Sequence, residues 1–478
     1  MNNYPDVQLY IDGKWRPAEG DRWISVTDPS NAQEIGRVAH ATQRDLDAAL
    51  VAADTGFGIW SRTSAFERAK IMRRAAENLR SQVEEIARWM TLEQGKPLAQ
   101  SRLEALAGAD IIDWFAGEAQ RTYGQVIPAR ASDILQVTIK RPVGPVAAFT
   151  PWNFPINQIV RKLSAAVAAG CSIIIKAPVE TPASPAGLIK AFDDAGIPPG
   201  VVNLINGRST EISRYLIPHP IIRKISFTGS TAVGKELAAL AGLHMKRSTM
   251  ELGGHAPVIV ADDADLDLAL ATMVPFKFRN AGQVCISPTR FLVAESVFDE
   301  FSDRFGRAAK EIKVGNGLHP TTEMGPLINE KRVETVDGLV TDALKRGARL
   351  VAGGRRIGNQ GSYYEPTVLA NVPSSALIMN EEPFGPVAVI NSFSAVDEAI
   401  AEANRLPFGL AAYAYTRDGA LATRLGNEIR SGMTSINHVG LALPEVPFGG
   451  VGDSGFGTEG GSEAIESYLD TSFVTRKG

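Results

Sequence analysis

Residues 144–176 read GPVAAFTPWNFPINQIVRKLSAAVAAGCSIIIK, and this stretch decides the fold. It begins with a short apolar run at 144–150, continues into an alanine-rich segment with helical spacing at 157–169, and ends in a second apolar run at 172–176. Short apolar strands that alternate with helices are typical of a parallel sheet covered on both faces. The stretch therefore predicts a dinucleotide-type α/β layer.

The same alternation extends along the chain on both sides. It predicts further strands at 135–141, 201–206, 222–227, 258–261, 290–293, 387–393 and 411–415. Helical spacing predicts helices at 45–53, 66–93, 98–115, 184–195, 298–312 and 329–346. The tail at 463–473 is predicted to form a helix and an edge strand. We therefore predict an α/β protein in which a second α/β domain begins near residue 254.

The composition excludes several classes of protein. The chain has 478 residues, with 49 Lys+Arg against 53 Asp+Glu and a net charge of -4, so a strongly basic nucleic-acid binder is not predicted. Its only cysteines, Cys171 and Cys285, exclude a disulfide scaffold and a Cys-only zinc site. The longest uncharged apolar stretch, 163–175, is too short for the roughly 30 Å bilayer core. We predict a cytoplasmic protein with no metal site and no membrane or nucleic-acid partner.

A glycine-rich segment, Gly229-Ser-Thr-Ala-Val-Gly-Lys235, follows a predicted strand and opens a predicted helix. Its spacing is similar to that of a P-loop, but Glu236 stands where a P-loop needs Ser or Thr for Mg²⁺. A tight turn that caps a helix is the simpler interpretation. The free N–H groups of such a helix start would also suit a pyrophosphate.

Cys285 lies in a polar, glycine-containing loop, whereas Cys171 begins an apolar run. We interpret Cys171 as a packed core residue and Cys285 as a candidate nucleophile. None of the six histidines is near Cys285 in sequence. A cofactor-independent cysteine esterase would therefore need a distant histidine, and it remains the alternative from another class.

Two further polar residues stand at the ends of predicted strands. Glu251 precedes a Gly-Gly turn and could act as a general base, although such a carboxylate is commonly a surface residue. Asn153 is pinned between two prolines in Thr150-Pro-Trp-Asn-Phe-Pro155, where its amide could cap the turn or stabilise an oxyanion.

Together these stretches resemble the aldehyde dehydrogenase superfamily across about residues 8–475. The segments that carry the resemblance are 150–155, Lys176 with Thr181-Pro182, 227–230, 251–254, 282–285, 382–386 and 447–455. The resemblance implies a dinucleotide-binding domain (1–123 and 143–253), a catalytic domain (254–455) and a small β oligomerisation flap (124–142 and 456–478). It also implies a homodimer or a homotetramer.

The resemblance also implies a role for each site residue. Cys285 would attack the aldehyde to give a thiohemiacetal, with the Asn153 amide and the Cys285 N–H holding the oxyanion. Hydride transfer would leave a thioester, which Glu251 would hydrolyse by activating water. Lys162 and Glu459 would relay the proton. Because members that transfer the acyl group to coenzyme A typically lack the Glu251 base, the expected product is the free acid.

The implied cofactor is NAD or NADP. Lys176 would reach the adenosine ribose, Ser230 the pyrophosphate, and Glu382 with Phe384 the nicotinamide ribose. The remaining implied cofactor positions are Thr150, Pro151, Trp152, Val179, Gly207, Gly229 and Leu252. Val179 departs from the family pattern, because many NAD-preferring members have a glutamate there. Its absence removes a repulsion against a 2′-phosphate, so both cofactors stay open.

Arg161 and Arg279 match positions at which semialdehyde dehydrogenases of the family clamp the far carboxylate of the substrate. Ordinary salt bridges are the alternative for both arginines. Succinate semialdehyde is the predicted substrate, with 2-oxoglutarate semialdehyde as the alternative. Ala442 and Leu443 stand where succinate-semialdehyde enzymes usually have a serine, which leaves room for another ω-carboxy or aryl aldehyde.

Overall fold

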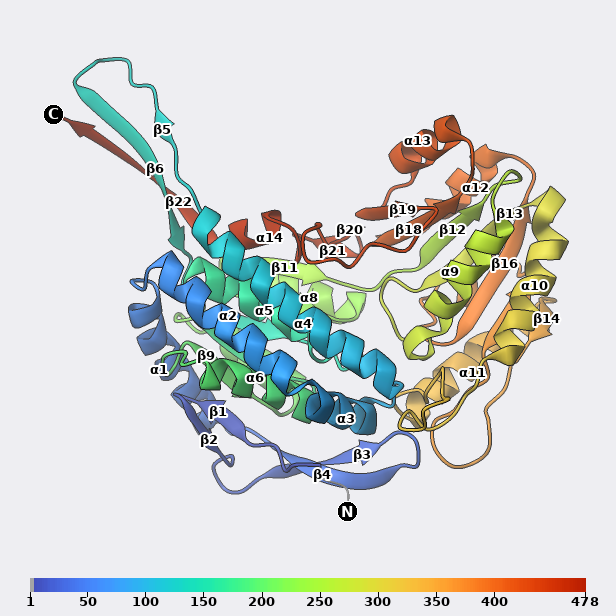
Figure 1. Cartoon of the computed structure of the whole chain (residues 1–478), viewed down its shortest axis with the longest axis horizontal. Helices are drawn as coiled ribbons and strands as arrows, with labels where there is room; N and C mark the ends of the chain where they lie inside the picture. Colours follow the sequence, from blue (N-terminus) through green and yellow to red (C-terminus); the bar gives the residue numbers. More distant parts are fainter. Residues whose placement is uncertain (1–3) are drawn as a thin grey trace.

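The computed structural model describes residues 4–478, and two large sheets form its main body (Figure 1). The first sheet has the strand order β2-β1-β9-β8-β7-β10-β11-β21. Its strands are β1 (Leu9–Ile11), β2 (Lys14–Arg16), β7 (Val146–Phe149), β8 (Ile173–Lys176), β9 (Val202–Ile205), β10 (Lys224–Thr228), β11 (Arg247–Glu251) and β21 (Gly455–Phe456). The strands β7 to β11 run parallel, and antiparallel strands close both edges.

Helices cover both faces of this sheet, because successive strand residues point to opposite sides. Val146 and Ala148 pack in one core with α2 to α6, whereas Ala147 and Phe149 pack in another with α1, α7 and α8. These helices are α1 (Gln43–Trp60), α2 (Ala65–Ser81), α3 (Val83–Gln94), α4 (Leu98–Glu118), α5 (Asn157–Ala169), α6 (Ala183–Asp194), α7 (Ser209–Leu216) and α8 (Thr231–Leu243). The predicted two-sided parallel layer is confirmed.

The second sheet repeats this architecture with the strand order β14-β15-β16-β13-β12-β18-β19. Its strands are β12 (Ala256–Val260), β13 (Pro288–Ala294), β14 (Arg349–Ala352), β15 (Thr367–Ala370), β16 (Val387–Phe393), β18 (Ala411–Tyr415) and β19 (Met433–Ile436). All of its pairings are parallel except the β14–β15 pair. Its helices are α9 (Leu266–Phe278), α10 (Phe298–Glu311), α11 (Glu330–Lys345), α12 (Val396–Ala403) and α13 (Gly419–Glu428). The second α/β unit is therefore also present.

A three-stranded sheet projects from the body (Figure 1). It joins β5 (Val126–Ile127) and β6 (Ile134–Pro142) to β22 (Leu469–Lys477), which pairs with β6 along its whole length. The smaller elements are β3 (Trp23–Asp28), β4 (Gln33–Ala39), β17 (Phe408–Gly409), β20 (Val451–Gly452) and α14 (Glu463–Glu466). Among the described residues, no helix combines the length and apolar character that crossing a bilayer requires.

The prediction of one helix over 66–93 is wrong, because the chain breaks at Gln82 between α2 and α3. Gln82 has φ -102° and ψ 9°, outside the helical range, and its N–H donates to the Asn78 and Leu79 carbonyls that end α2. The Gln82 carbonyl then accepts from the Ile86 N–H and begins α3. Gln82 is one polar residue among many in this stretch, so the sequence alone does not indicate that the helix breaks there.

Candidate active site

Two cavities meet between the large sheets, and together they contain most of the predicted site residues. One has a volume of about 310 Å³ and lies over the carboxyl ends of the first sheet, with Gly229, Glu251 and Glu382 in its wall. The other, of about 330 Å³, is bounded by Phe154, Phe448 and both predicted arginines. Cys285 and Gln158 line both cavities. We call the first the cofactor cavity and the second the aldehyde cavity.

The loop that carries Cys285 has an unusual backbone. Asn280, Ala281 and Gly282 all have positive φ values, of 50°, 53° and 70°. A Cβ on Gly282 would lie 2.1 Å from the Gly385 carbonyl oxygen, so only glycine fits there. Burial and the nearby carboxylates of Glu251 and Glu382 raise the pKa of the Cys285 thiol. The thiol therefore needs a base to give up its proton.

Glu251 ends β11 and is almost fully buried. The Cys285 thiol and the Thr228 hydroxyl face its carboxylate, and each lowers the pKa of Glu251 by less than burial raises it. Burial, followed by the negative charge of Glu459, raises the pKa of Glu251 to about 7. A carboxylate with a pKa near neutrality suits general-base chemistry. No histidine lines either cavity in the described part of the chain, so Glu251 is the candidate base.

A buried ion pair between Lys162 and Glu459 lies behind Glu251. The Lys162 ammonium donates to Glu459 and, at 2.6 Å, to the hydroxyl of Thr228, which is the β10 partner of Glu251. Ser226 donates to the same Glu459 oxygen at 3.1 Å. The structure thus brings both predicted relay residues to the buried side of Glu251.

Asn153 is buried, and its Nδ2 donates to the Gln283 carbonyl at 3.1 Å, on the Cys285 loop. Its own main-chain carbonyl accepts from the Lys96 ammonium at 2.7 Å. Lys96 in turn makes a 2.5 Å ion pair with buried Glu104. No motif in the sequence marked Lys96 or Glu104, so both residues were missed as the support of the Asn153 turn.

The cofactor cavity has features that suit the pyrophosphate and nicotinamide end of a dinucleotide. The α8 helix begins after Ser230 with no side-chain cap and no acidic residue in its first turn, which leaves N–H groups free for a pyrophosphate. Trp152 and Phe384 meet edge to face at 5.7 Å. Glu382 accepts from the Gly254 N–H at 3.3 Å, and burial raises its pKa to about 8. Pro151, Trp152, Gly229, Ser230, Leu252, Glu382 and Phe384 therefore share one cavity wall.

The other predicted cofactor residues do not line this cavity. Thr150, Lys176 and Gly207 stand at or just after the carboxyl ends of β7, β8 and β9, the edge at which open parallel sheets bind ligands. The Lys176 ammonium donates to the Ser209 hydroxyl at 2.8 Å, and burial lowers the pKa of Lys176 to about 8. Val179 packs against an apolar cluster near β4.

Arg161 and Arg279 enter the aldehyde cavity from different elements. Arg161 donates to the Ala442 carbonyl at 2.8 Å and stacks on Phe448 at 4.8 Å. The guanidinium of Arg279 lies 5.3 Å from the centre of the Phe154 ring. Across residues 4–478, neither arginine has an acidic partner within ion-pair distance. The salt-bridge alternative is therefore not seen, and both positive charges remain available to an anion.

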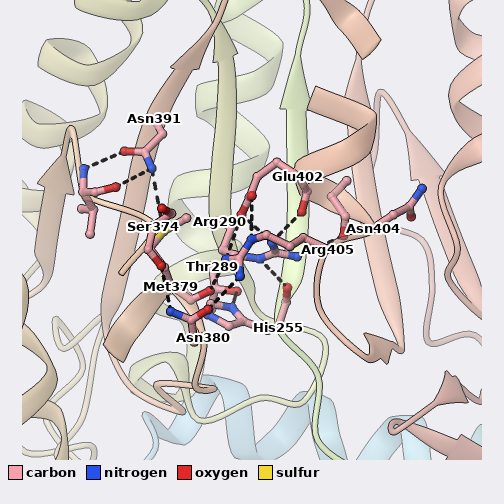
Figure 2. Close-up of polar contacts among 12 residues, drawn as sticks. His255, Thr289, Arg290, Ser374, Met379, Asn380, Asn391, Glu402, Asn404 and Arg405 are labelled. Carbon is pink, nitrogen blue, oxygen red and sulfur yellow. Dashed lines mark hydrogen bonds and ion pairs between the residues drawn. The ribbon is translucent and has the colours of Figure 1, made fainter. Parts of the chain in front are cut away.

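Figure 2 shows a polar network around the segment before Glu382, and this network is buried at His255 and Arg290 and exposed at Arg405. Burial lowers the pKa of His255 well below its ordinary value, and the ring donates through Nε2 to the Ile378 carbonyl at 2.8 Å. Arg405 donates to Asn380 Oδ1 at 2.7 Å. None of these residues carried a motif in the sequence, because only the tertiary contacts give them a common role.

The chain belongs to the aldehyde dehydrogenase family, whose model matches residues 15–474. It is an NAD(P)-dependent aldehyde dehydrogenase with the fold of that family. It is 44% identical over 471 residues to 4-(hydroxymethyl)benzenesulfonate dehydrogenase TsaD1 of Comamonas testosteroni, covering 98% of each chain. It is 41% identical to the NADP(+) succinate-semialdehyde dehydrogenase GabD of Escherichia coli K12, covering 98% of this chain and 97% of GabD.

A solved succinate-semialdehyde dehydrogenase from Burkholderia pseudomallei superposes with a TM-score of 0.97 at 39% identity, covering 99% of this chain and 98% of that one. The superposed region covers both large sheets and the projecting sheet. The predicted family and fold class are confirmed.

Proposed function

We propose that this enzyme oxidises an aldehyde with an anionic group at its far end to the free acid, and that succinate semialdehyde is its first candidate substrate. The observation that carries this proposal is that Arg161 and Arg279, in the aldehyde cavity, have no acidic partner among the described residues. Relatives whose names specify a benzenesulfonate or a semialdehyde of a dicarboxylic acid support it, since those compounds carry a sulfonate or a carboxylate. Guanidinium groups bind either anion through two parallel N–H donors.

In the proposed mechanism Cys285 is the nucleophile. Its thiolate, formed when solvent takes the thiol proton, attacks the aldehyde carbon, and the carbonyl oxygen takes the negative charge. The amide of Asn153 and the main-chain N–H of Cys285 stabilise that oxygen. NAD(P), when bound, supplies the hydride acceptor. Trp152, Glu382 and Phe384 line the cavity beside the sulfur and orient the acceptor there.

Loss of hydride leaves a thioester on Cys285, and the Glu251 carboxylate then acts as the general base of its hydrolysis. It takes a proton from a water that attacks the thioester carbon, which releases the carboxylic acid and restores the thiolate. The ion pair of Lys162 and Glu459 on the buried side of Glu251 accepts the surplus proton. Because Glu251 is available for this step, coenzyme A is not required as acyl acceptor.

An aryl aldehyde with an anionic substituent is a second candidate. Two aromatic rings, Phe154 and Phe448, line the aldehyde cavity beside the arginines, together with Val284 and Ile286. This apolar wall would pack against a substrate ring. Ala442, in the position where a serine was expected from the family, keeps that wall free of a hydroxyl.

Arg279→Met is expected to lower kcat/KM for succinate semialdehyde by about a hundredfold, because a buried charge pair is lost. The same variant should hardly change the already low kcat/KM for the methyl ester, which has no charge to bind. Initial rates of NAD(P)H formation with both substrates measure this. The exposed Arg417, replaced by Met, is the control. Equal losses for acid and ester would contradict the anion clamp.

The acid limb of the pH profile is expected to report Glu251. Its pKa is raised to about 7, so the fraction in the basic carboxylate form grows as pH rises and is complete above that value. The rate of thioester hydrolysis should therefore rise about tenfold per pH unit below 7 and level off above it. Steady-state kcat between pH 5 and 9 measures this. A flat profile in the wild-type enzyme would contradict the assignment.

We also propose that NADP is accepted as well as NAD, because Val179 places no carboxylate at the adenosine ribose. Val179→Glu is then expected to shift the ratio of kcat/KM for NAD over NADP by at least about tenfold towards NAD, since a carboxylate repels the 2′-phosphate. Val179→Leu is the matched control. An unchanged ratio in Val179→Glu would show that this residue does not face the ribose.

We further propose a homodimer or homotetramer assembled through the projecting sheet of β5, β6 and β22. Several large apolar side chains are exposed on these strands, which favours a partner surface. They are Val126, Leu135, Ile139, Phe473 and Val474. A cytoplasmic location and the boundaries of the three domains stay predictions from the sequence.

A further inference from the structure

Gln158 occupies a position that the proposed reaction does not use. It is the one residue besides Cys285 that lines both cavities in the described part of the chain. The residue is 6% exposed, and within residues 4–478 neither atom of its amide has a hydrogen-bond partner. The amide opens onto both cavities and makes no hydrogen bond within the described residues, so its donor and its acceptor are free to pair with a bound ligand.

The α5 helix carries both Gln158 and Arg161, one of the two arginines of the proposed anion site. Gln158 and Arg161 are three residues apart, so they lie on the same face about one turn apart. Arg161 lines only the aldehyde cavity, whereas Gln158 also reaches the junction at Cys285. A substrate with its aldehyde carbon on the sulfur and its anion at Arg161 and Arg279 must therefore pass Gln158 close to the reacting end.

The chemistry of the amide defines what it can recognise there. Its NH₂ group donates and its carbonyl accepts, so it can satisfy both functions of a hydroxyl group. A methylene group in place of the hydroxyl could not pair with the amide, and it would only contact the nearby apolar wall. We propose that Gln158 recognises a hydroxyl group on the carbon next to the aldehyde, which makes the preferred substrate an anionic 2-hydroxyaldehyde. This proposal rests on the anion-bearing substrate proposed above.

The test compares succinate semialdehyde with its derivative that carries a hydroxyl on the carbon next to the aldehyde, each enantiomer separately. The wild-type enzyme is expected to favour one hydroxylated enantiomer by at least about tenfold in kcat/KM, because the plain aldehyde leaves the buried amide unpaired. Gln158→Met, similar in length but without the amide, should bring this ratio close to one. Leu103→Met, a change in the wall of the aldehyde cavity that alters no polar group, should keep the wild-type ratio.

A binding measurement on the same proteins separates this proposal from the proposed function. Calorimetric titration with the two product acids, succinate and its hydroxylated counterpart, needs no turnover. The hydroxy acid should bind the wild-type protein about tenfold more tightly and Gln158→Met with equal affinity. Equal binding of both acids by the wild-type protein, or a preference that survives in Gln158→Met, overturns the assignment. Lack of aldehyde oxidation with the binding preference intact would overturn only the proposed function.

Discussion

Cys285→Ala is expected to reduce aldehyde-dependent NAD(P)H formation by at least about 10⁴-fold. The substitution removes the atom that forms the covalent intermediate, and among residues 4–478 no other cysteine lines either cavity. Because the alanine leaves the walls of both cavities in place, the variant should still bind the cofactor. Stopped-flow and long-time absorbance assays at 340 nm measure the loss, and fluorescence titration measures cofactor affinity.

The second cysteine gives a matched control. Cys171 is fully buried, its thiol faces the Tyr468 carbonyl at 3.5 Å, and burial raises its pKa to about 11. Cys171→Ala should therefore keep the rate and lose only some thermal stability. An active Cys285→Ala enzyme would remove Cys285 from the role of nucleophile, and an inactive but folded Cys171→Ala enzyme would contradict the purely structural role of Cys171.

Glu251→Gln is expected to separate the two halves of the reaction. The amide has nearly the shape of the carboxylate but cannot take a proton from water, so the thioester should form and then persist. We expect a burst of a single equivalent of NAD(P)H per active site, followed by a steady rate about 10²- to 10⁴-fold below that of the wild type. Rapid-mixing kinetics measure the burst and the steady rate in one trace.

The exposed Glu381 offers the control for this variant, since it is adjacent to the cofactor cavity but lines neither cavity. Glu381→Gln should turn over at the wild-type rate. Loss of the burst itself in Glu251→Gln would show that Glu251 is needed already to deprotonate Cys285. Full steady turnover would exclude Glu251 as the base that activates water.

Much of the fold could be predicted, because both sheets are built from short apolar runs with clear ends. The predicted helix 157–169 and the strands 387–393 and 411–415 agree with the bounds of α5, β16 and β18. The strands β1 to β4 were not predicted. They are short or carry polar residues on the outward face, so their apolar pattern is weak. β1 and β2 pair with each other, as do β3 and β4, and in the described part of the chain only β1 of these four joins a distant strand, through Tyr10 and Leu204.

The site shows the same division. Cys285, Glu251 and Asn153 stood out because each follows or precedes a turn next to an apolar run. Gln158 and the pair of Lys96 and Glu104 did not, because a polar residue on a helix or in a helix stop is usually solvated. These residues become buried only when α4, α5 and the loop before Cys285 pack together. The local sequence pattern does not predict such tertiary contacts.

The most direct test of the covalent mechanism is the mass of the Cys285 peptide after acid quench of Glu251→Gln, mixed with succinate semialdehyde and cofactor. The mechanism predicts one succinyl group on the peptide that carries Cys285, formed at the rate of the NAD(P)H burst, and none on the Cys171 peptide. NAD(P)H formation with an unmodified Cys285 peptide, or an acyl group on another residue, would contradict it.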